Sequence, residues 1–140
     1  MRPVVEKRFE YKGYPCVVLM QPLCFRTGYV GLPKGNQYFH KNYNAIPVYC
    51  HGGLTYASDD LYGQTDEDTW WIGFDTGHYG DGHDFEEGKR LYAGNEEALK
   101  HIEMCERTML YHDGPARTLR YCEHECKRIV DQLIKNQGGK

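Results

Sequence analysis

Five side chains that can act as acids, bases or metal ligands lie close together in one glycine-rich segment. The segment 75–84, DTGHYGDGHD, contains Asp75, His78, Asp81, His83 and Asp84. Neutral imidazole and carboxylate are the usual ligands of zinc, iron and manganese, so one interpretation is a divalent-metal site. The spacing fits no ligand motif, however, and a polar loop whose side chains meet only water is a second interpretation.

A third interpretation makes the same segment a lid over a phosphorylated ligand. Backbone N–H groups at glycine-rich turns bind phosphate oxygens, and Trp71 or a tyrosine could stack on a base. Three basic residues from other loops, Arg26, Lys34 and Lys41, would complement the phosphate charge. The sequence contains no G-x-x-x-x-G-K-[ST] element to strengthen this interpretation, and all three stay open.

The residues 69–75 are expected to form a strand, and alternate side chains of this strand would face one surface. Neighbouring side chains of a strand point to opposite faces, so Trp71, Gly73 and Asp75 share one face and the residues between them enter the core. The stretch 46–57 is expected to be another strand, bulged at Gly52-Gly53. If the two strands pair, His51, Asp75 and Trp71 line one water-accessible hollow, where glycines let a ligand approach the backbone.

An antiparallel sheet of about five strands, within residues 1–75, is expected to carry these positions. The segments 4–11 and 14–20 flank Lys12-Gly13, a two-residue hairpin turn, and 14–20 is apolar on both faces, as a central strand would be. The strands expected in chain order are 4–11, 14–20, 27–33, 46–57 and 69–75, with a polar loop at 34–44.

Helical periodicity replaces the strand pattern from about residue 94. Asn95, followed by two glutamates, is a suitable N-cap for a helix that ends near His112. Pro115 is expected at the first position of a second helix. The apolar stripes are Leu99, Ile102, Cys105 and Met109 in the first helix, and Leu119, Cys122, Cys126, Ile129, Val130 and Leu133 in the second. The expected fold is therefore α+β in a single domain, 1–140, with the sheet followed by a C-terminal helical hairpin.

The cysteines are expected to be free thiols. The chain has six, and its beginning lacks the apolar stretch of a secretory signal, so we expect the reducing cytoplasm of a host cell. A zinc site is one interpretation of the segment Cys122-Glu-His-Glu-Cys126. Both cysteines belong to the apolar stripe, however, so packing in the core is favoured. His124 and the two glutamates are expected to point into solvent.

Composition favours a binding surface over a nucleic-acid or membrane surface. The formal net charge is −3, and no segment approaches the roughly 20 apolar residues of a membrane span, so neither DNA nor a membrane is expected as a partner. The chain has 12 tyrosines and 16 glycines, typical of rigid rings on adaptable loops. Aromatic cross-strand pairs in a β-rich domain are the alternative explanation.

Several motifs carry a resemblance that spans nearly the whole chain. They are GYVGLPKGN (28–36), CHGGLTYA (50–57), DTWWIGFDTGH (68–78) and ARTLRYCEHECKRIVDQ (116–132). In these motifs the chain resembles a family of small phage and prophage proteins from low-GC Gram-positive bacteria. The resemblance implies an accessory phage protein that counters bacterial immunity, for example by sequestering a nucleotide second messenger. It assigns no role to any single residue.

The leading hypothesis is a phage-encoded protein that binds and sequesters a nucleotide-derived immune signal without turnover, with no catalytic residue and no cofactor. The expected ligand-binding residues are Arg26, Tyr29, Lys34, His51, Gly52, Gly53, Tyr56, Trp71, Asp75 and His78. One alternative is a metal-assisted, phosphodiesterase-like hydrolase using His51, Asp75, His78 and Asp81. Another is a direct protein inhibitor of a host immune enzyme. A homodimer or higher homo-oligomer is expected in each case, because the helical hairpin offers an apolar surface to bury.

Overall fold

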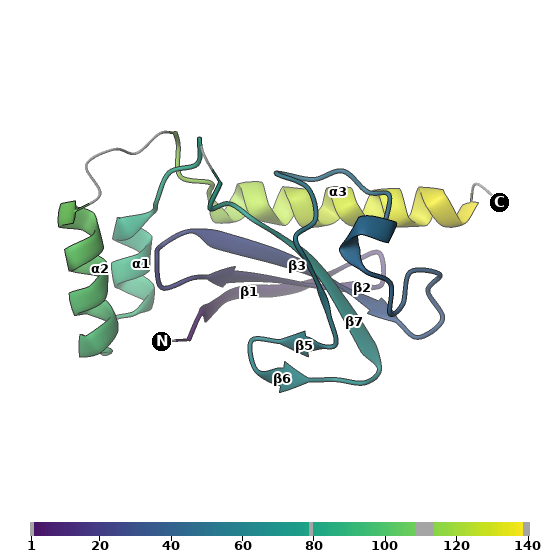
Figure 1. The fold of residues 1–140 in the computed structure, drawn as a ribbon, viewed down its shortest axis with the longest axis horizontal. Helices are drawn as coiled ribbons and strands as arrows, with labels where there is room; N and C mark the ends of the chain where they lie inside the picture. Colours follow the sequence, from purple (N-terminus) through teal and green to yellow (C-terminus); the bar gives the residue numbers. More distant parts are fainter. Residues whose placement is uncertain (1, 79, 109–113, 139–140) are drawn as a thin grey trace.

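A five-stranded antiparallel sheet with strand order β1-β2-β3-β7-β4 forms the centre of the molecule (Figure 1). The computed structural model describes residues 2–78, 80–108 and 114–138. The strands of the sheet are β1 (Val4–Tyr11), β2 (Tyr14–Met20), β3 (Arg26–Pro33), β7 (Thr69–Asp75) and β4 (Tyr56–Ser58). A second sheet is the hairpin of β5 (Asp60–Leu61) and β6 (Gln64–Thr65), and a short 3₁₀ helix, η1 (Tyr43–Ala45), interrupts the loop after β3.

The hairpin of β1 and β2 forms as its turn residues predict. Lys12 and Gly13 both have positive φ, 50° and 86°, which is the conformation that a two-residue turn requires between antiparallel strands. Antiparallel pairing brings Tyr11 opposite Tyr14. The sheet thus begins with a tight local contact, and β2 is buried between β1 and β3 as its two apolar faces predict.

One face of the sheet is covered by the long helix α3 (Leu119–Gly138), which runs along it in Figure 1. The stripe of α3 from Cys122 to Leu133 packs against Val18, Val30 and Ile72 of the sheet. The stripe residues that are fully buried there are Cys122, Cys126, Ile129, Val130 and Leu133. Because this stripe is covered by the chain's own sheet, it does not call for a second copy, and the expected homo-oligomer stays a prediction.

Two further helices, α1 (Phe85–Leu91) and α2 (Glu96–Thr108), lie side by side at one end of the sheet (Figure 1). Asn95 caps α2 as predicted, because its side-chain oxygen accepts the backbone N–H of Ala98 at 3.0 Å. Ile102 and Cys105 of α2 pack in a small core with Phe85 and Met20. The sequence predicts α2 and α3 as a packed pair, but α2 packs with α1 while α3 packs on the sheet.

The α+β class, the antiparallel sheet of five strands and the C-terminal helices are confirmed. The start of α3 is later than predicted: Thr118 is its cap, with its hydroxyl accepting the N–H of Tyr121, so Pro115 precedes the helix. The expected stripe residue Met109 and the expected helix end near His112 lie outside the described residues. None of the described helices has the length and apolarity needed to cross a bilayer.

The expected strand 46–57 is wrong over most of its length. Only Tyr56–Ser58 forms a strand of the sheet, β4, and the segment up to His51 runs beside α3. The Gln132 side chain bonds both the N–H and the carbonyl of Tyr49, and the Glu125 carboxylate accepts the N–H of His51. Apolar residues alternate here because Ile46 and Val48 enter the core, while side chains of α3 satisfy backbone groups that a strand partner would otherwise bond.

Candidate functional site

The face of the sheet opposite α3 carries a hollow because of its cross-strand pairs. Tyr29 of β3 is opposite Gly73 of β7, which is opposite Tyr56 of β4, so all three lie on the same face. Gly73 is required at the centre of this row, because a Cβ there would lie 2.5 Å from the Tyr29 ring. The next row pairs Thr27 with Asp75. Two tyrosine rings therefore border a space whose far end is polar.

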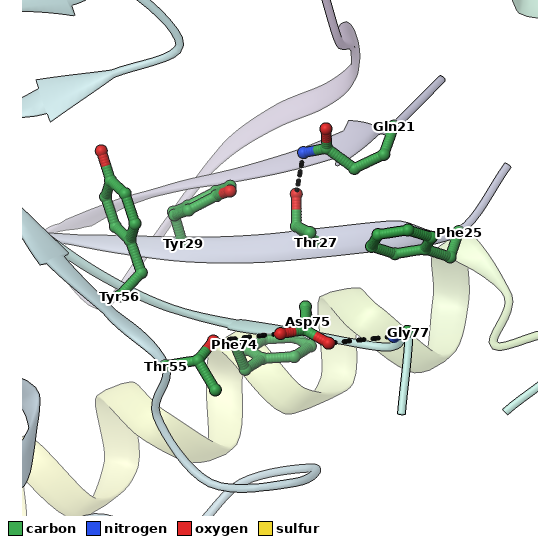
Figure 2. A pocket seen from close by; sticks show the side chains of 9 residues that line it. All are labelled: Gln21, Phe25, Thr27, Tyr29, Thr55, Tyr56, Phe74, Asp75 and Gly77. Carbon is green, nitrogen blue, oxygen red and sulfur yellow. Dashed lines mark hydrogen bonds between the residues drawn. The ribbon is translucent and has the colours of Figure 1, made fainter. Parts of the chain in front are cut away.

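This hollow has a volume of about 460 Å³. The residues that line it are Gln21, Phe25, Thr27, Tyr29, Thr55, Tyr56, Phe74, Asp75 and Gly77 (Figure 2). Tyr29 and Tyr56 meet edge to face, with ring centroids 5.4 Å apart. Burial raises the pKa of the Tyr29 phenol, so Tyr29 stays a neutral aromatic wall at physiological pH.

The polar end of the hollow is ordered by hydrogen bonds that Figure 2 draws as dashed lines. The Asp75 carboxylate accepts the Thr55 hydroxyl at 3.2 Å and the Gly77 N–H at 3.0 Å. The Gln21 amide donates to the Thr27 hydroxyl at 3.0 Å. A carboxylate held in this way has lone pairs left to accept hydrogen bonds from a ligand's hydroxyl or amino groups.

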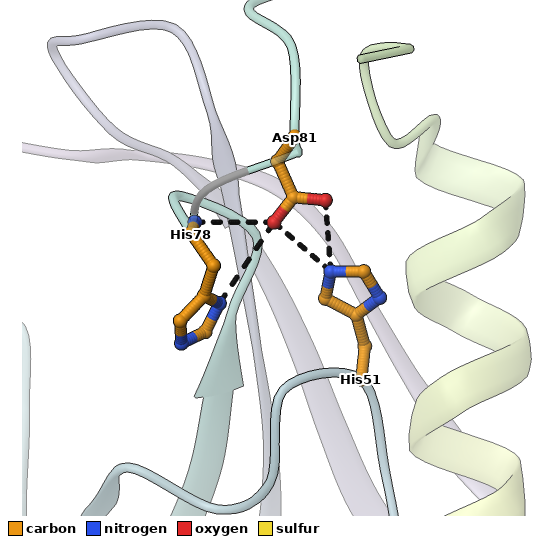
Figure 3. Close-up of side chains that lie close together, drawn as sticks. All are labelled: His51, His78 and Asp81. Carbon is orange, nitrogen blue, oxygen red and sulfur yellow. Dashed lines mark hydrogen bonds and ion pairs between the residues drawn. The ribbon is translucent and has the colours of Figure 1, made fainter. Parts of the chain in front are cut away.

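Next to the hollow, three predicted residues converge from two loops (Figure 3). His51 Nε2 lies 2.9 and 3.0 Å from the two carboxylate oxygens of Asp81, and the backbone N–H of His78 donates to Asp81 at 3.1 Å. The His78 Nδ1 atom lies 3.3 Å from an Asp75 oxygen and 3.8 Å from an Asp81 oxygen. Asp75 therefore belongs both to the wall of the hollow and to the histidine cluster.

Two residues support this cluster: Arg117, just before α3, and Tyr121, in the first turn of α3. The Tyr121 hydroxyl lies 2.7 Å from His51 Nδ1, and Arg117 Nε donates to Asp81 at 2.9 Å. Burial alone would raise the pKa of the Asp81 carboxyl, but the bonds from His51 and Arg117 outweigh it and hold that pKa below its usual value. Asp81 is therefore anionic at physiological pH, with a side chain that is only 3% exposed.

The glycines of this region serve close packing. A Cβ on Gly52 would lie 2.5 Å from the His78 ring, and one on Gly82 would lie 2.3 Å from the carbonyl oxygen of Gly114. The Gly82 N–H also donates to the Pro115 carbonyl at 2.9 Å. These contacts hold the loop that carries Asp81 against the segment that carries Arg117. The interpretation of 75–84 as a polar loop whose side chains meet only water is therefore wrong for Asp81.

The predicted residues divide between the two places. The hollow contains Tyr29, Tyr56 and Asp75, whereas His51 and His78 lie in the cluster with Asp81. Gly52 contacts the His78 ring, and Gly53 forms the adjoining turn with a φ of +80° and open space around it. The four residues of the metal alternative thus lie close together, although His51 is on a loop and not on the strand that was expected to carry it.

Three other predicted residues do not reach the hollow. Arg26 is 2% exposed and bonds the Glu6 and Asp84 carboxylates, so it is a structural cation. Lys34 is exposed and pairs with Asp68 at 2.8 Å. Trp71 lies on the predicted face but is 7% exposed and packs with Leu61 of the small hairpin.

The expectation that Trp71 and His51 line one hollow is therefore wrong. His51 is held toward α3 through its backbone N–H, which donates to Glu125, and through its ring, which contacts Tyr121. Trp71 points from β7 toward the small hairpin, on the face of the sheet opposite α3. On the same face, the hollow begins at the row of Tyr29, Gly73 and Tyr56, which is next to the row of Trp71, and it extends to the row of Asp75.

Sequence reasoning missed the supporting residues. Glu125 was expected in solvent, but it is 4% exposed and accepts the His51 N–H. Arg117 and Tyr121 sit just before and within the first turn of α3, and no spacing in the sequence relates them to His51 or Asp81. For Thr55 the sequence does contain a signal, namely its position directly before β4. The pairing of β4 with β7 brings Thr55 beside Asp75.

Comparison with protein-family models, with curated proteins and with solved structures returns no match. The function must therefore be argued from the geometry of the hollow and the cluster.

Proposed function

We propose that this protein binds a small nucleotide-derived molecule in the hollow beside Tyr29, Tyr56 and Asp75, and retains it without chemical change. The observation that carries the proposal is the pairing of two aromatic walls with an ordered carboxylate at one end of a space of about 460 Å³. Ligand pockets for small molecules have volumes of this order and combine aromatic walls with a few fixed polar groups.

The polar groups favour the nucleoside part of such a ligand. Asp75 can accept hydrogen bonds from ribose hydroxyls or from an amino group of a base, and Thr27 and Thr55 offer hydroxyls beside it. The rings of Tyr56 and Phe25 supply faces on which a base can stack, an interaction that is tolerant of base identity. No lysine or arginine is among the described residues that line the hollow, so the predicted phosphate contacts of Arg26 and Lys34 are not retained in this proposal.

The proposed biological role rests on the resemblance of the sequence motifs to those of phage proteins. A protein that holds an immune signalling nucleotide in the cytoplasm of an infected cell keeps the signal from its effector, and this requires affinity but no turnover. Competitive sequestration needs the protein in excess of the signal and a dissociation constant below the signal's working concentration.

Isothermal titration of the purified chain against nucleosides, cyclic nucleotides and cyclic ADP-ribose isomers tests the proposal. We expect saturable heat with at least one of these ligands, weakened at least tenfold by Tyr56→Ala and by Asp75→Asn. Tyr49→Ala is the matched control, because Tyr49 is 77% exposed and lies outside the hollow. Absence of heat with every ligand, or equal weakening by the control, would overturn the proposal.

Mass spectrometry of the ligand after prolonged incubation separates binding from the alternatives. Recovery of the intact molecule supports sequestration. Recovery of a hydrolysed product would identify the hydrolase alternative instead, which the gathering of His51, Asp75, His78 and Asp81 keeps open. Stable co-purification with a host immune enzyme, in the absence of small-molecule binding, would identify a protein inhibitor.

A further inference from the structure

The histidine cluster has the donor set of a transition-metal site. One ligand atom from each of His51, His78 and Asp81 lies within 4.8 Å of the other two. Ligands of tetrahedral zinc, with bonds of about 2.0–2.2 Å, are separated by about 3.4 Å, so side-chain shifts of about 1 Å would close the set. Two imidazoles with one carboxylate favour zinc, iron or manganese over calcium and magnesium, which prefer oxygen ligands.

His78 supplies an independent sign that something binds here. Its Nδ1 atom is buried and makes no hydrogen bond to any described residue. Oxygens of Asp75 and Asp81 lie 3.3 and 3.8 Å from it, so two carboxylates face the nitrogen at ion-pair distance but outside hydrogen-bonding geometry. A buried nitrogen without a hydrogen bond is costly, and a cation among these three groups would satisfy the nitrogen and both carboxylates together.

The surroundings of the cluster are those that metal ligands need. Tyr121 bonds His51 Nδ1, which orients the ring with Nε2 toward Asp81. Arg117 bonds one Asp81 oxygen, and the His78 N–H bonds the other. Partners of this kind fix ligand orientation and are usual around metal-binding histidines and carboxylates. Gly52 packs against the His78 ring and limits its position.

We propose that His51, His78 and Asp81 bind a divalent transition-metal ion, with zinc as the best match, and that the carboxylate of Asp75 is the neighbouring fourth group. The proposal goes beyond the proposed function and does not rest on it, because the metal ligands are complete without an occupant of the hollow. Since Asp75 also lines the hollow, a metal here would place positive charge beside a pocket whose described lining has none.

Titration of the chelator-treated 140-residue chain with Zn²⁺ and Co²⁺ tests the site directly. We expect one ion per chain by calorimetry, and visible absorption of the Co²⁺ form with the intensity of a four- or five-coordinate site. His78→Ala should weaken metal binding at least tenfold. This variant should keep its fold, because the His78 side chain is 38% exposed and its buried Nδ1 makes no hydrogen bond to described residues. His124→Ala is the matched control, since His124 is exposed and lies on α3 away from the cluster.

Thermal unfolding with and without Zn²⁺ gives a second readout that does not depend on activity. An ion that binds only the folded chain raises its melting temperature with concentration. We expect this rise in the native chain and in His124→Ala, and its loss in His78→Ala and His51→Ala. The proposal is overturned if the native chain binds neither ion, or if His124→Ala weakens binding as much as His78→Ala. The outcome is independent of the nucleotide titrations, so either proposal can fail alone.

Discussion

Two clusters of charged side chains lie next to each other in this molecule and share one residue. Arg26 bonds Glu6 and Asp84, while Asp81 bonds His51 and Arg117. Arg117 joins them, because its carbonyl accepts a hydrogen bond from the Arg26 guanidinium and its own guanidinium donates to Asp81. Both clusters are made of the residue types that commonly form active sites.

The clusters differ in whether their hydrogen bonds are complete. Arg26 uses Nε and both terminal nitrogens on two carboxylates and a carbonyl, and it is 2% exposed. In the other cluster the buried Nδ1 of His78 has no hydrogen bond among the described residues, and Asp75 borders a hollow. A complete, closed cluster stabilises a fold, whereas an incomplete one beside a hollow can accept a ligand. This difference supports our proposal that the second cluster binds a ligand, whereas the first stabilises the fold.

The largest expected effect tests the assignment of Arg26 to folding. Arg26→Met leaves the carboxylates of Glu6 and Asp84 in place without their cation, and breaking a buried pair in this way costs about 3–5 kcal/mol of unfolding free energy. Urea unfolding followed by circular dichroism measures this loss. Lys34→Ala, which removes the other predicted phosphate contact, should change the urea midpoint very little because its pair with Asp68 is exposed. Similar midpoints for the two variants would contradict the assignment.

A smaller effect is expected where α3 holds the loop that carries His51. Glu125→Ala removes a buried, charge-assisted hydrogen bond to the His51 N–H, at a cost of about 2 kcal/mol. Because the loop is then free of α3 at this point, metal affinity should fall as well. Glu123→Ala is the neighbouring control, since Glu123 pairs with Lys7 at the surface. If Glu125→Ala unfolds with the stability of Glu123→Ala, the buried bond is not what holds His51.

The sheet could be predicted from the sequence because the patterns that define its strands and first turn lie within short segments of the chain. Alternation and turn chemistry give the bounds of β1, β2, β3 and β7 to within a residue, and Lys12-Gly13 gives the register of the first hairpin. The segment 46–55 misleads because alternation reports which side chains are buried and not what bonds the backbone. Here the partners are Gln132 and Glu125, more than 70 residues away on a helix.

The candidate site could be predicted only in part, for the same physical reason. His51, Asp75, His78 and Asp81 can be chosen by residue type, but their supporting partners Arg117 and Tyr121 depend on where α3 begins. Arg26 illustrates the opposite failure: residue type suggests a phosphate ligand, while its partners Glu6 and Asp84 come from distant segments. Choosing between the two clusters requires knowing which atoms remain unbonded, and that is a property of the folded chain.

Two adjacent glycines allow the position of His78 to be tested with little change elsewhere. Gly52 and Gly53 have φ of +68° and +80°, so Ala at either position costs about 1–2 kcal/mol in backbone strain. Only at Gly52 would the new Cβ meet the His78 ring, at 2.5 Å, whereas Gly53 has open space. We therefore expect similar urea midpoints for Gly52→Ala and Gly53→Ala but a weaker affinity for Co²⁺ in Gly52→Ala alone. Equal affinities would show that the site does not depend on the His78 ring position.

The smallest effect on stability, about 1 kcal/mol, is expected from Tyr121→Phe, which removes one hydroxyl and leaves the ring in place. Without that hydroxyl, His51 Nδ1 has lost the bond that fixes the imidazole ring with Nε2 toward Asp81. Metal affinity should therefore fall about tenfold, as it does when other residues that orient metal ligands are changed. Co²⁺ titration measures the affinity, and urea unfolding measures the stability. Tyr11→Phe, which removes a surface bond to Asp131, is the control for losing a hydroxyl. If the two variants bind Co²⁺ equally well, Tyr121 only packs beside His51. The residues around the proposed ligands then give no support to the distinction between a closed cluster and a binding cluster.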